Sequence, residues 1–549
     1  MNGAEYVVRT LQERGVERIF ALCGNGLAPF LEACGALEMP VIDVRNEQSA
    51  AYMADLWGRM TGRLGVVAVS SGPGHTNALT GLANAWWDGG PLLLISGQSD
   101  DLSRGLDHFQ ELDQVEMAAP VTKYARRVHH ESALGFMLDE AIAQATTSRP
   151  GPVHLTIPED VLAAPFAEEP EPEHGTTPAS VQGVGPADEA LVGQALDMLA
   201  AAERPFLLVG SGAFYSGVWE PLRRLAEATN VPILTHIWDR GCIEEAIPQY
   251  VGVTNDELNG AMASFSEADL VLAVGARLDY RVGYARPPAI DADVRIIRID
   301  ADPAELHRGR RADLAIAGEP RLALDALATL AGEREGWAND EWLAEVRATR
   351  EALKAQYAGL CVGDECPMPG LRICQEIQPF LQRDLTFLLD GGNIGRWAHL
   401  WLFDRHPSHW MTCGASGVVG WGVPGAVAAR LARPDRPVLL LSGDGAAGFT
   451  FTDVETALRF GTPYVMVVAH DAAWGIVADA QPPERRVACE LGEIRFDRLA
   501  QALGARGVYI EEPSALAPAI EEGLGLDTVT VIQVPTELGG LSAYTGNQG

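Results

Sequence analysis

The sequence predicts an α/β protein of three domains, each built on a parallel sheet. Along most of its 549 residues, short apolar runs end in glycine-rich turns and alternate with helical patterns, which is typical of βαβ units. A chain of this length exceeds one hydrophobic core. Composition breaks at residues 166–186, rich in Pro and Glu, and at 331–369, where a charged helix over 340–357 is expected. We therefore expect domains at residues 1–165, 187–330 and 366–549.

The C-terminal domain contains a βαβ unit between Pro437 and Trp474. Its first apolar strand ends in Gly443-Asp444-Gly445 and its second ends in His470-Asp471. Both strand ends lie at the same edge of a parallel sheet, where open α/β sheets bind ligands. Two aspartates there would suit one hard cation with oxygen ligands. The flanking glycines let the backbone approach an anion, so the pattern predicts a metal and a phosphate at this edge.

This stretch resembles the signature of the thiamine diphosphate (ThDP) enzymes of the acetolactate synthase-like, 2-oxo acid decarboxylase superfamily, which is Gly-Asp-Gly, a spacer and usually Asn-Asn. Here 24 residues separate Gly445 from His470. The resemblance implies that Asp444, Asp471 and the backbone carbonyl of Ala473 hold Mg²⁺, which binds the diphosphate. His470-Asp471 stands where Asn-Asn is usual, so an oxygen ligand is kept and a negative charge is added.

Residues 41–97 resemble the pyrimidine-binding domain of the same superfamily. An Arg-x-Glu-Gln-like run contains Glu47, and Ser71-Gly72-Pro73-Gly74 follows the next strand. The resemblance gives Glu47 the activating role: its carboxylate bonds to N1′ of the aminopyrimidine and favours the tautomer whose nitrogen removes the thiazolium C2 proton. The ordinary alternative is a glutamate at a helix start, where the macrodipole favours negative charge. The three domains are then pyrimidine-binding, central and diphosphate-binding.

The other site residues are placed by position within the same resemblance. Candidate proton carriers on loops after the N-terminal strands are His75, His108, Gln110 and Glu111. Expected contacts with ThDP, besides Glu47, Asp444 and Asp471, are Gly72, Asn393, Ile394, Gly417, Val419, Gly443, Gly445, Ala446, Trp474 and Gly475. Because Glu47 and Asp444 belong to different domains, the cofactor must bridge them. In the superfamily the bridge joins two subunits, which implies a homodimer or homotetramer with active sites at the subunit interface.

A competing pattern lies just before the Gly-Asp-Gly strand. Residues 420–425 fit Gly-x-Gly-x-x-Gly, with Asp444 ending the next strand about 20 residues later, as in a dinucleotide fingerprint. This alternative predicts a nucleotide-dependent oxidoreductase. The glycine-rich residues 413–417 make a poor first strand, which favours the ThDP interpretation.

The central region contains two further patterns. Gly210-Ser211-Gly212 follows one predicted strand and Gly275-Ala276-Arg277 follows another. In relatives such turns hold FAD or ADP, although a glycine-rich turn needs no ligand. Residues 275–283 also resemble the acetolactate synthase segment that recognises an acceptor carboxylate, which places Arg281 as a substrate-binding residue. A guanidinium suits a carboxylate bidentately, and a surface ion pair is the alternative.

Two positions distinguish the branches of the superfamily. Acetolactate synthases have a Trp where this chain has Ala480, and Asn393-Ile394 replaces a Gln-His pair near the diphosphate. The runs from Asp107 and Asp302 resemble the 2-hydroxyacyl-CoA lyase and oxalyl-CoA decarboxylase branch, but the segment after the last strand is short for CoA-handling relatives. We expect C–C bond cleavage or formation at a 2-oxo acid or related carbonyl by a decarboxylase, lyase or carboligase. A 2-hydroxyacyl-CoA lyase and acetolactate synthase itself stay open, and a regulator without activity is disfavoured by Glu47.

Composition agrees with a cytoplasmic enzyme that acts on small molecules. The formal net charge of −33 disfavours nucleic acid and anionic membranes as partners. No apolar stretch reaches the roughly 18 residues of a membrane span, and the N-terminus begins with an amphipathic helical pattern rather than a signal peptide. The eight cysteines lack metal-binding spacing, so we expect reduced core residues.

Overall fold

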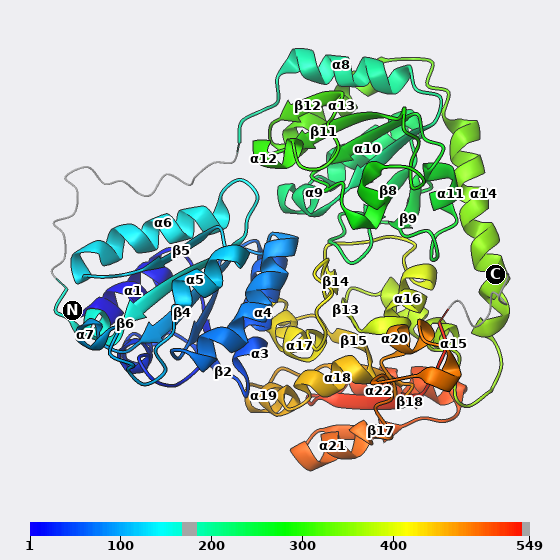
Figure 1. Ribbon diagram of the computed structural model, residues 1–549. Coiled ribbons are helices and arrows are strands. Elements are labelled where there is room, and N and C mark those ends of the chain that lie inside the picture. Colours follow the sequence, from blue (N-terminus) through cyan, green and yellow to red (C-terminus); the bar gives the residue numbers. More distant parts are fainter. Residues whose placement is uncertain (167–183, 541–549) are drawn as a thin grey trace.

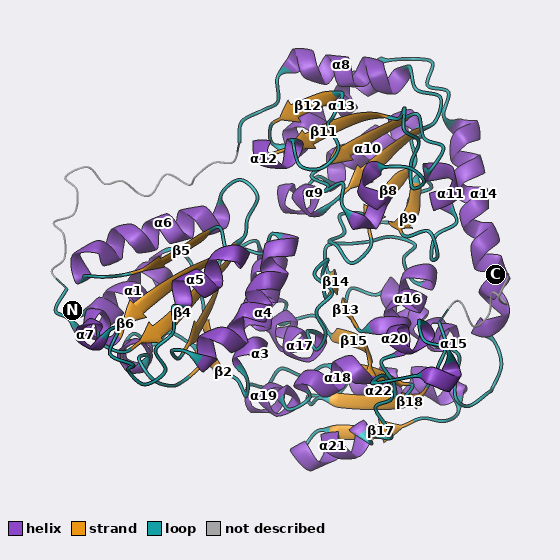
Figure 2. Cartoon of the chain, in the orientation of Figure 1, coloured by secondary structure: helices purple, strands orange, loops and turns teal. Residues whose placement is uncertain are grey.

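The computed structural model describes residues 1–166 and 184–540 and contains three six-stranded sheets. Each sheet forms its own lobe with helices packed against it (Figures 1 and 2). Every strand pair within the sheets is parallel, which confirms the predicted α/β class. The linker predicted at 166–186 lies almost entirely outside the described residues, and the expected domain boundaries stay a prediction.

The N-terminal sheet has the strand order β2-β1-β3-β4-β6-β5. Its strands are β1 (Ile19–Leu22), β2 (Val41–Asp43), β3 (Gly65–Val69), β4 (Leu92–Gln98), β5 (Tyr124–Arg127) and β6 (Pro152–Pro158). Its helices are α1 (Gly3–Glu13), α2 (Ala28–Ala36), α3 (Glu47–Thr61), α4 (Pro73–Asp88), α5 (Gln114–Ala118), α6 (Leu134–Thr146) and α7 (Glu159–Ala163).

The C-terminal sheet repeats this order as β14-β13-β15-β16-β18-β17. Its strands are β13 (Thr386–Asp390), β14 (Trp410–Thr412), β15 (Val438–Gly443), β16 (Val465–His470), β17 (Arg506–Tyr509) and β18 (Thr530–Pro535). Its helices are α15 (Gly370–Ile377), α16 (Gly392–Trp401), α17 (Gly422–Ala432), α18 (Asp444–Thr450), α19 (Asp453–Arg459), α20 (Gly475–Asp479), α21 (Phe496–Leu503) and α22 (Leu516–Leu524). The shared order confirms that the two outer domains are similar parallel units.

The central sheet has the order β12-β11-β10-β7-β8-β9, that of a doubly wound nucleotide-binding fold. Its strands are β7 (Pro205–Val209), β8 (Ile233–His236), β9 (Tyr250–Thr254), β10 (Leu270–Val274), β11 (Arg295–Asp300) and β12 (Leu314–Ala317). Its helices are α8 (Glu189–Ala200), α9 (Ser211–Ser216), α10 (Trp219–Thr229), α11 (Ala261–Phe265), α12 (Pro303–Leu306) and α13 (Pro320–Glu333). Helix α14 (Asp340–Tyr357) then leads into the C-terminal domain, with the bounds predicted for the charged helix.

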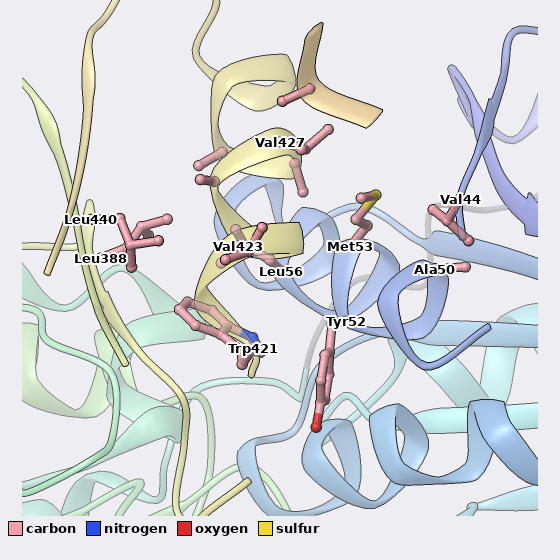
Figure 3. Packing of buried hydrophobic residues seen from close by; sticks show 14 of the residues in the cluster. Val44, Ala50, Tyr52, Met53, Leu56, Leu388, Trp421, Val423, Val427 and Leu440 are labelled. Carbon is pink, nitrogen blue, oxygen red and sulfur yellow. The ribbon is translucent and has the colours of Figure 1, made fainter. Parts of the chain in front are cut away.

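Helix α3 joins the two outer domains. The Asn46 side chain caps its first turn by accepting the N–H of Gln48, and Gly62 ends it in the left-handed conformation. Its buried face packs against α17, where Leu56 lies beside Val423 (Figure 3). Each fully buried aliphatic side chain of this kind contributes roughly 1.5–3 kcal/mol. The interface therefore holds the N-terminal and C-terminal domains of one chain together.

A buried ion cluster strengthens the same junction. The Arg59 guanidinium lies 3.2 Å from the Asp55 carboxylate and 3.5 Å from that of Asp88, and it donates to the Thr412 carbonyl at 2.9 Å. The Asp88 carboxylate also accepts the N–H of Ala415. A charge buried in this way must be paired, so the cluster fixes the end of α4 against the segment after β14.

Candidate active site

A cavity of about 160 Å³ lies at the carboxyl ends of β13, β15, β16 and β18. The predicted ThDP contacts that line it are Asn393, Ile394, Val419, Gly443, Asp444, Gly445, Ala446, Asp471, Ala473, Trp474 and Gly475. Gly417 is exposed and does not line it. Among the described residues, the lining comes from the C-terminal domain alone. We call this cavity the diphosphate pocket.

Asp444 and Asp471 meet in this pocket. Asp444 begins α18 and accepts the N–H of Gly445 at 2.8 Å, and Asp471 accepts the N–H of Ala473 at 3.1 Å. Burial raises the pKa of Asp444, and burial together with the nearby Asp444 charge raises the pKa of Asp471 to about 7. Two carboxylates held this close favour a proton or a cation between them.

The donor set fits a hard cation that is shared with a diphosphate. Within the described part of the chain, no group of three or more His, Cys, Asp and Glu side chains is arranged to hold a metal ion. Two carboxylates and the Ala473 carbonyl would therefore need further oxygen ligands from the cofactor. His470 is buried, and its Nε2 lies 3.8 Å from the Asp444 carboxylate, where the superfamily usually has Asn.

Glycines let the residues of the pocket pack closely around it. A Cβ on Gly445 would lie 2.7 Å from the Trp474 ring, and one on Gly475 would lie 2.6 Å from both Asp471 and Asn393. Both amide atoms of Asn393 are buried without a hydrogen-bond partner among the described residues. Buried polar atoms are nearly always bonded in native proteins, so this amide is available to bond a phosphate oxygen. These features fit ThDP and Mg²⁺.

Glu47 lies on the other outer domain. It is the first residue of α3, and its carboxylate accepts a 3.0 Å hydrogen bond from the Asn77 amide. A Cβ on Gly74 would lie 3.1 Å from the Glu47 carboxylate and 2.4 Å from the Ser70 hydroxyl. The glycine turn therefore lets α4 approach the carboxylate. Asn77 was not predicted as a site residue, although it lies within the matching block.

Gln110 and His108 lie beside the same turn. Gln110 has a left-handed φ of 61°, and its side chain accepts a 3.1 Å hydrogen bond from Ser71. A Cβ on Gly72 would lie 2.6 Å from the Gln110 carbonyl, which explains the glycine there. His108 is half-buried, and its backbone N–H donates to the Glu111 carboxylate. Because they lie beside this turn, Gln110 and His108 stay candidates for proton transfer.

The structure gives no support to the proton-carrier role predicted for His75. Its ring is fully buried, 2.8 Å from the Ser96 hydroxyl through Nδ1 and 4.7 Å from the His154 ring. Burial lowers the pKa of His75 to about 4. A neutral, inaccessible ring of this kind supports the packing of α4 on the sheet and does not exchange protons with a substrate.

Arg281 is also placed differently from its predicted role. It is buried, and its guanidinium donates to Asp279 at 2.8 and 3.0 Å and to Asp239 at 3.1 Å. These two carboxylates neutralise the charge, and Asp239 first and then Asp279 hold the pKa of Arg281 above its ordinary value despite burial. Arg281 is committed to an internal network, so the structure does not present it to a substrate carboxylate.

The dinucleotide alternative fails at the first turn of α17. A pyrophosphate in that motif binds the free N–H groups of a helix N-terminus. Here the buried Asp390 carboxylate already accepts the Gly422 N–H at 2.6 Å. The N–H that a phosphate would need is therefore already bonded, and residues 420–425 form a packing turn.

Several residues that line the diphosphate pocket were not predicted from the sequence. Gly391 and Gly392 follow β13, Thr536 follows β18, and Ile476 and Val477 form part of α20. The first three could have been found, because they directly follow apolar runs that end at the same sheet edge. Ile476 and Val477 gave no signal, since half-exposed aliphatic residues on a short helix have no distinctive pattern.

Fold and site together are those of an α/β protein with a polar, glycine-lined pocket at a sheet edge and a buried carboxylate, Glu47, at a helix start of a second domain. Comparison with known families matches "Thiamine pyrophosphate enzyme, N-terminal TPP binding domain" at residues 1–117, the central domain of the same enzymes at 192–327 and their C-terminal TPP binding domain at 390–534. The matches leave the dinucleotide alternative without support.

Individual relatives agree with these matches. The chain is 31% identical to the acetolactate synthase large subunit of Lactococcus lactis subsp. lactis, over 94% of this chain and 89% of the relative. It is 30% identical to the acetolactate synthase isozyme 3 large subunit of Escherichia coli, over 95% of this chain and 92% of the relative. It is 29% identical to a probable acetolactate synthase of Mycobacterium bovis, over 98% of this chain and 96% of the relative. The chain belongs to the ThDP-dependent, acetolactate synthase-like enzymes, and ThDP is its cofactor.

Two further sequence expectations can be compared with the structure. All eight cysteines are free. Six are buried, as expected of core residues, whereas Cys23 and Cys366 are exposed. Across residues 1–166 and 184–540, no helix has the length and hydropathy that a bilayer crossing requires.

Proposed function

We propose that this chain is a ThDP- and Mg²⁺-dependent enzyme that cleaves or forms the C–C bond next to the carbonyl of a 2-oxo acid. The observation that supports this most strongly is the pairing of Asp444 with Asp471 beside the unsatisfied Asn393 amide. Bound ThDP supplies the electron sink for this chemistry. The chain supplies a cradle for the diphosphate, a carboxylate for the aminopyrimidine and a chamber for the substrate.

We further propose that the active site is completed by a second copy of the chain. The diphosphate pocket has no lining residue from the N-terminal domain. Within one chain, α3 faces the C-terminal domain through other residues: Ser49 bonds to Asp453 and Tyr52 to the Val419 carbonyl. Glu47 instead bonds to Asn77 of its own domain. A homodimer, or a homotetramer made from two such dimers, would bring Glu47 to the partner's diphosphate pocket.

Exposed apolar side chains on both halves support this assembly. Beside the turn near Glu47, one loop exposes Leu102, Leu106 and Phe109. The diphosphate pocket exposes Val477 in its lining, and Phe449 is exposed next to the Trp474 ring. Exposed apolar side chains grouped near a site indicate an interaction surface. Docking of these two surfaces would exclude water from the reacting carbonyl.

The proposed substrate is a 2-oxo acid, and ligation of two pyruvates to acetolactate is expected to be slow. Arg281 is neutralised by Asp239 and Asp279 and cannot bind an acceptor carboxylate. Ala480 lies where acetolactate synthases have a Trp. The second candidate is acetolactate synthase itself, which the names of the relatives favour. A 2-hydroxyacyl-CoA thioester is the remaining alternative substrate.

A nucleotide in the central domain has weaker support. The turns after β7 and β10 pack directly on each other, because a Cβ on Gly212 would lie 2.7 Å from Gly275. Arg277 is paired with Glu305 in the crevice beside them, which leaves its guanidinium neutralised rather than open to a phosphate. We therefore assign no step to FAD or ADP. The cytoplasmic location, which the free cysteines support, stays a prediction.

The proposal is tested by assaying purified protein, supplied with ThDP and Mg²⁺, for turnover of a panel of 2-oxo acids and 2-hydroxyacyl-CoA thioesters. We expect CO₂ release from at least one 2-oxo acid and little acetolactate from pyruvate in a colorimetric acetoin assay. Acetolactate turnover near the roughly 10 s⁻¹ typical of native substrates would establish the second candidate. No turnover of any 2-oxo acid, in protein shown to bind ThDP, would contradict the proposal.

A further inference from the structure

Residues 412–420 lead from the end of β14 towards α17, where the three lobes meet (Figure 1). We call them the junction segment. It contains Val419, which lines the diphosphate pocket and is a predicted ThDP contact. Gly414, Gly417 and Gly420 have left-handed φ angles of 107°, 70° and 78°. Because glycine adopts many backbone conformations, the segment's own residues select none of them strongly, and contacts from outside decide its shape.

The N-terminal domain holds the first half of the junction segment. Arg59 and Asp88 bond to its backbone, and the Ser416 hydroxyl donates to the side-chain oxygen of Asn84 at 2.5 Å. A Cβ on Gly414 would collide with the Asp88 carboxylate, so a glycine is needed there for α4 to come this close. These bonds place the segment relative to α3 and α4.

The second half is held less firmly. At its end, the Gly420 carbonyl accepts the Thr450 hydroxyl of its own domain at 2.6 Å. The Val419 carbonyl has a long contact of 3.4 Å with the Tyr52 hydroxyl, which is near the limit for a hydrogen bond. The place of Val419 therefore depends on how well the two ends of the segment are fixed.

One side chain of the central domain also bonds to the junction segment. The Tyr280 hydroxyl donates to the Ala415 carbonyl at 2.8 Å, although Tyr280 is 45% exposed. Partial burial raises the pKa of Tyr280 to about 12, so the hydroxyl keeps the proton that it donates. Ala415 thus has its N–H bonded to the N-terminal domain and its carbonyl bonded to the central domain.

The backbone around Tyr280 is itself firmly held. Its two neighbours, Asp279 and Arg281, bond to each other, and Arg281 also bonds to the buried Asp239. The three residues 283–285 have left-handed φ angles of 55°, 58° and 51°. For Tyr284 and Ala285 this backbone is strained, and such strain persists only where the surrounding structure fixes the conformation. The Tyr280 hydroxyl therefore projects from a rigid part of the central domain.

We propose that Tyr280 is a positioning residue for the cofactor, whose hydroxyl holds the junction segment in the conformation that presents Val419 to ThDP. The buried network of Arg281, which does not reach a substrate, serves to hold Tyr280 in place. Fixing a binding segment in advance raises affinity, because less ordering remains to be done on binding. The inference rests on the proposed placement of ThDP in the diphosphate pocket and is independent of which carbonyl compound is the substrate.

Tyr280→Phe tests this role, because it removes the hydroxyl and keeps the ring. One net hydrogen bond shifts an equilibrium by roughly two- to tenfold, so the Kd for ThDP should rise by about that factor in titration calorimetry at saturating Mg²⁺. Adding Ser416→Ala, which removes a second bond to the segment, should raise the Kd further. Tyr284→Phe is the matched control and should leave the Kd unchanged, since this exposed tyrosine makes no hydroxyl hydrogen bond within the described residues.

Hydrogen exchange detected by mass spectrometry, before ThDP is added, locates the effect. Tyr280→Phe should speed amide exchange in residues 413–419 and leave the thermal midpoint close to that of the wild type. A wild-type Kd in Tyr280→Phe, or an equal rise in Tyr284→Phe, would overturn the inference. So would faster exchange spread over the central domain with a lowered thermal midpoint, which indicates a purely structural role.

Asp444→Ala separates this inference from the proposed function. If that variant loses ThDP binding while Tyr280→Phe binds like the wild type, the diphosphate pocket is correct and the role of Tyr280 alone is wrong. If Asp444→Ala binds ThDP as tightly as the wild type, the placement of the cofactor is wrong and both fail.

Discussion

At the residue scale, the Glu47 carboxylate lies in the first turn of α3 with the Asn77 amide bonded to it. Glu47→Gln should keep the fold and ThDP binding but slow hydrogen–deuterium exchange at C2 of the bound cofactor, because an amide does not support the required tautomer. A loss of roughly 10²- to 10⁴-fold is expected for a proton-transfer role. Glu189→Gln, which removes a first-turn glutamate from α8, is the matched control. Equal exchange rates in wild type and Glu47→Gln would refute the assignment.

The two carboxylates of the diphosphate pocket should respond differently to substitution. Asp444→Ala removes a ligand for which the pocket has no replacement, so ThDP binding should be lost. Asp471→Asn keeps an oxygen at its position and removes one negative charge, so ThDP should still bind while the affinity for Mg²⁺ falls. Calorimetric titrations with ThDP, with and without EDTA, measure both effects. Wild-type protein that binds ThDP equally well in EDTA would show that the pair does not hold a metal.

Arg281 should contribute to stability rather than to substrate affinity. Removing one partner of a buried charge network costs about 3–5 kcal/mol, because the remaining carboxylates stay buried and unpaired. Arg281→Met should therefore lower the thermal midpoint strongly, while the protein that stays folded keeps its KM for a 2-oxo acid. Arg295→Met, at an exposed pair with Asp269, is the control and should change stability by no more than about 0.5 kcal/mol. A raised KM with unchanged stability would restore Arg281 as a substrate residue.

His75 and Arg281 also show where sequence reasoning fails at this scale. Both residue types suit the predicted chemistry, and both stand next to matching motifs. Their roles are decided by distant partners: Ser96 and His154 for His75, and Asp239 for Arg281. The sequence does not show which residues will surround a side chain. Asp444 and Asp471 were predictable because each directly follows an apolar strand, and topology alone brings such ends together.

At the element scale, Asp390 connects the end of β13 to the start of α17. Burial raises the pKa of Asp390 to about 7 from 3.8, although N–H groups of the turn, including that of Gly422, oppose the shift. The native state therefore binds this proton more tightly than the unfolded state. Its stabilising contribution is complete below about pH 4 and is lost as pH rises towards 7.

Asp390→Asn should remove this pH dependence, because an amide does not titrate and its oxygen can still accept the Gly422 N–H. Between about pH 5 and pH 8, the thermal midpoint of the wild type should fall relative to that of the variant. Differential scanning calorimetry at several pH values measures the difference. Asp527→Asn, at an exposed aspartate, should follow the wild type. Parallel pH profiles for wild type and Asp390→Asn would contradict this account of the α17 N-terminus.

Strands and long helices were the most predictable elements. The strands predicted before the turns at 210–212 and 275–277 are β7 and β10, and the helix predicted at 340–357 has the bounds of α14, because apolar continuity and charge periodicity are local. The function of the Gly-x-Gly-x-x-Gly turn could not be inferred from its own residues. Its meaning depends on Asp390, a residue of another strand, which occupies the helix N-terminus that a nucleotide would need.

At the scale of the whole molecule, the two halves of the active site lie on separate domains of one chain. Helix α3 packs on α17 through its buried face, and this packing fixes Glu47 relative to its own C-terminal domain. The sequence predicted the three domains and the bridging cofactor. It could not show that the diphosphate pocket of a single chain lacks a lining residue from the N-terminal domain, because that depends on how the domains pack.

Subunit complementation tests the shared active site most directly. Glu47→Gln and Asp444→Ala proteins, each inactive alone, are co-expressed with different tags and assayed with ThDP, Mg²⁺ and a 2-oxo acid that the wild type turns over. Random pairing makes half of the dimers mixed, and each mixed dimer has one site with both residues intact, so about a quarter of wild-type activity is expected. Mixed dimers isolated by both tags that remain as inactive as either parent would contradict a site shared between two copies.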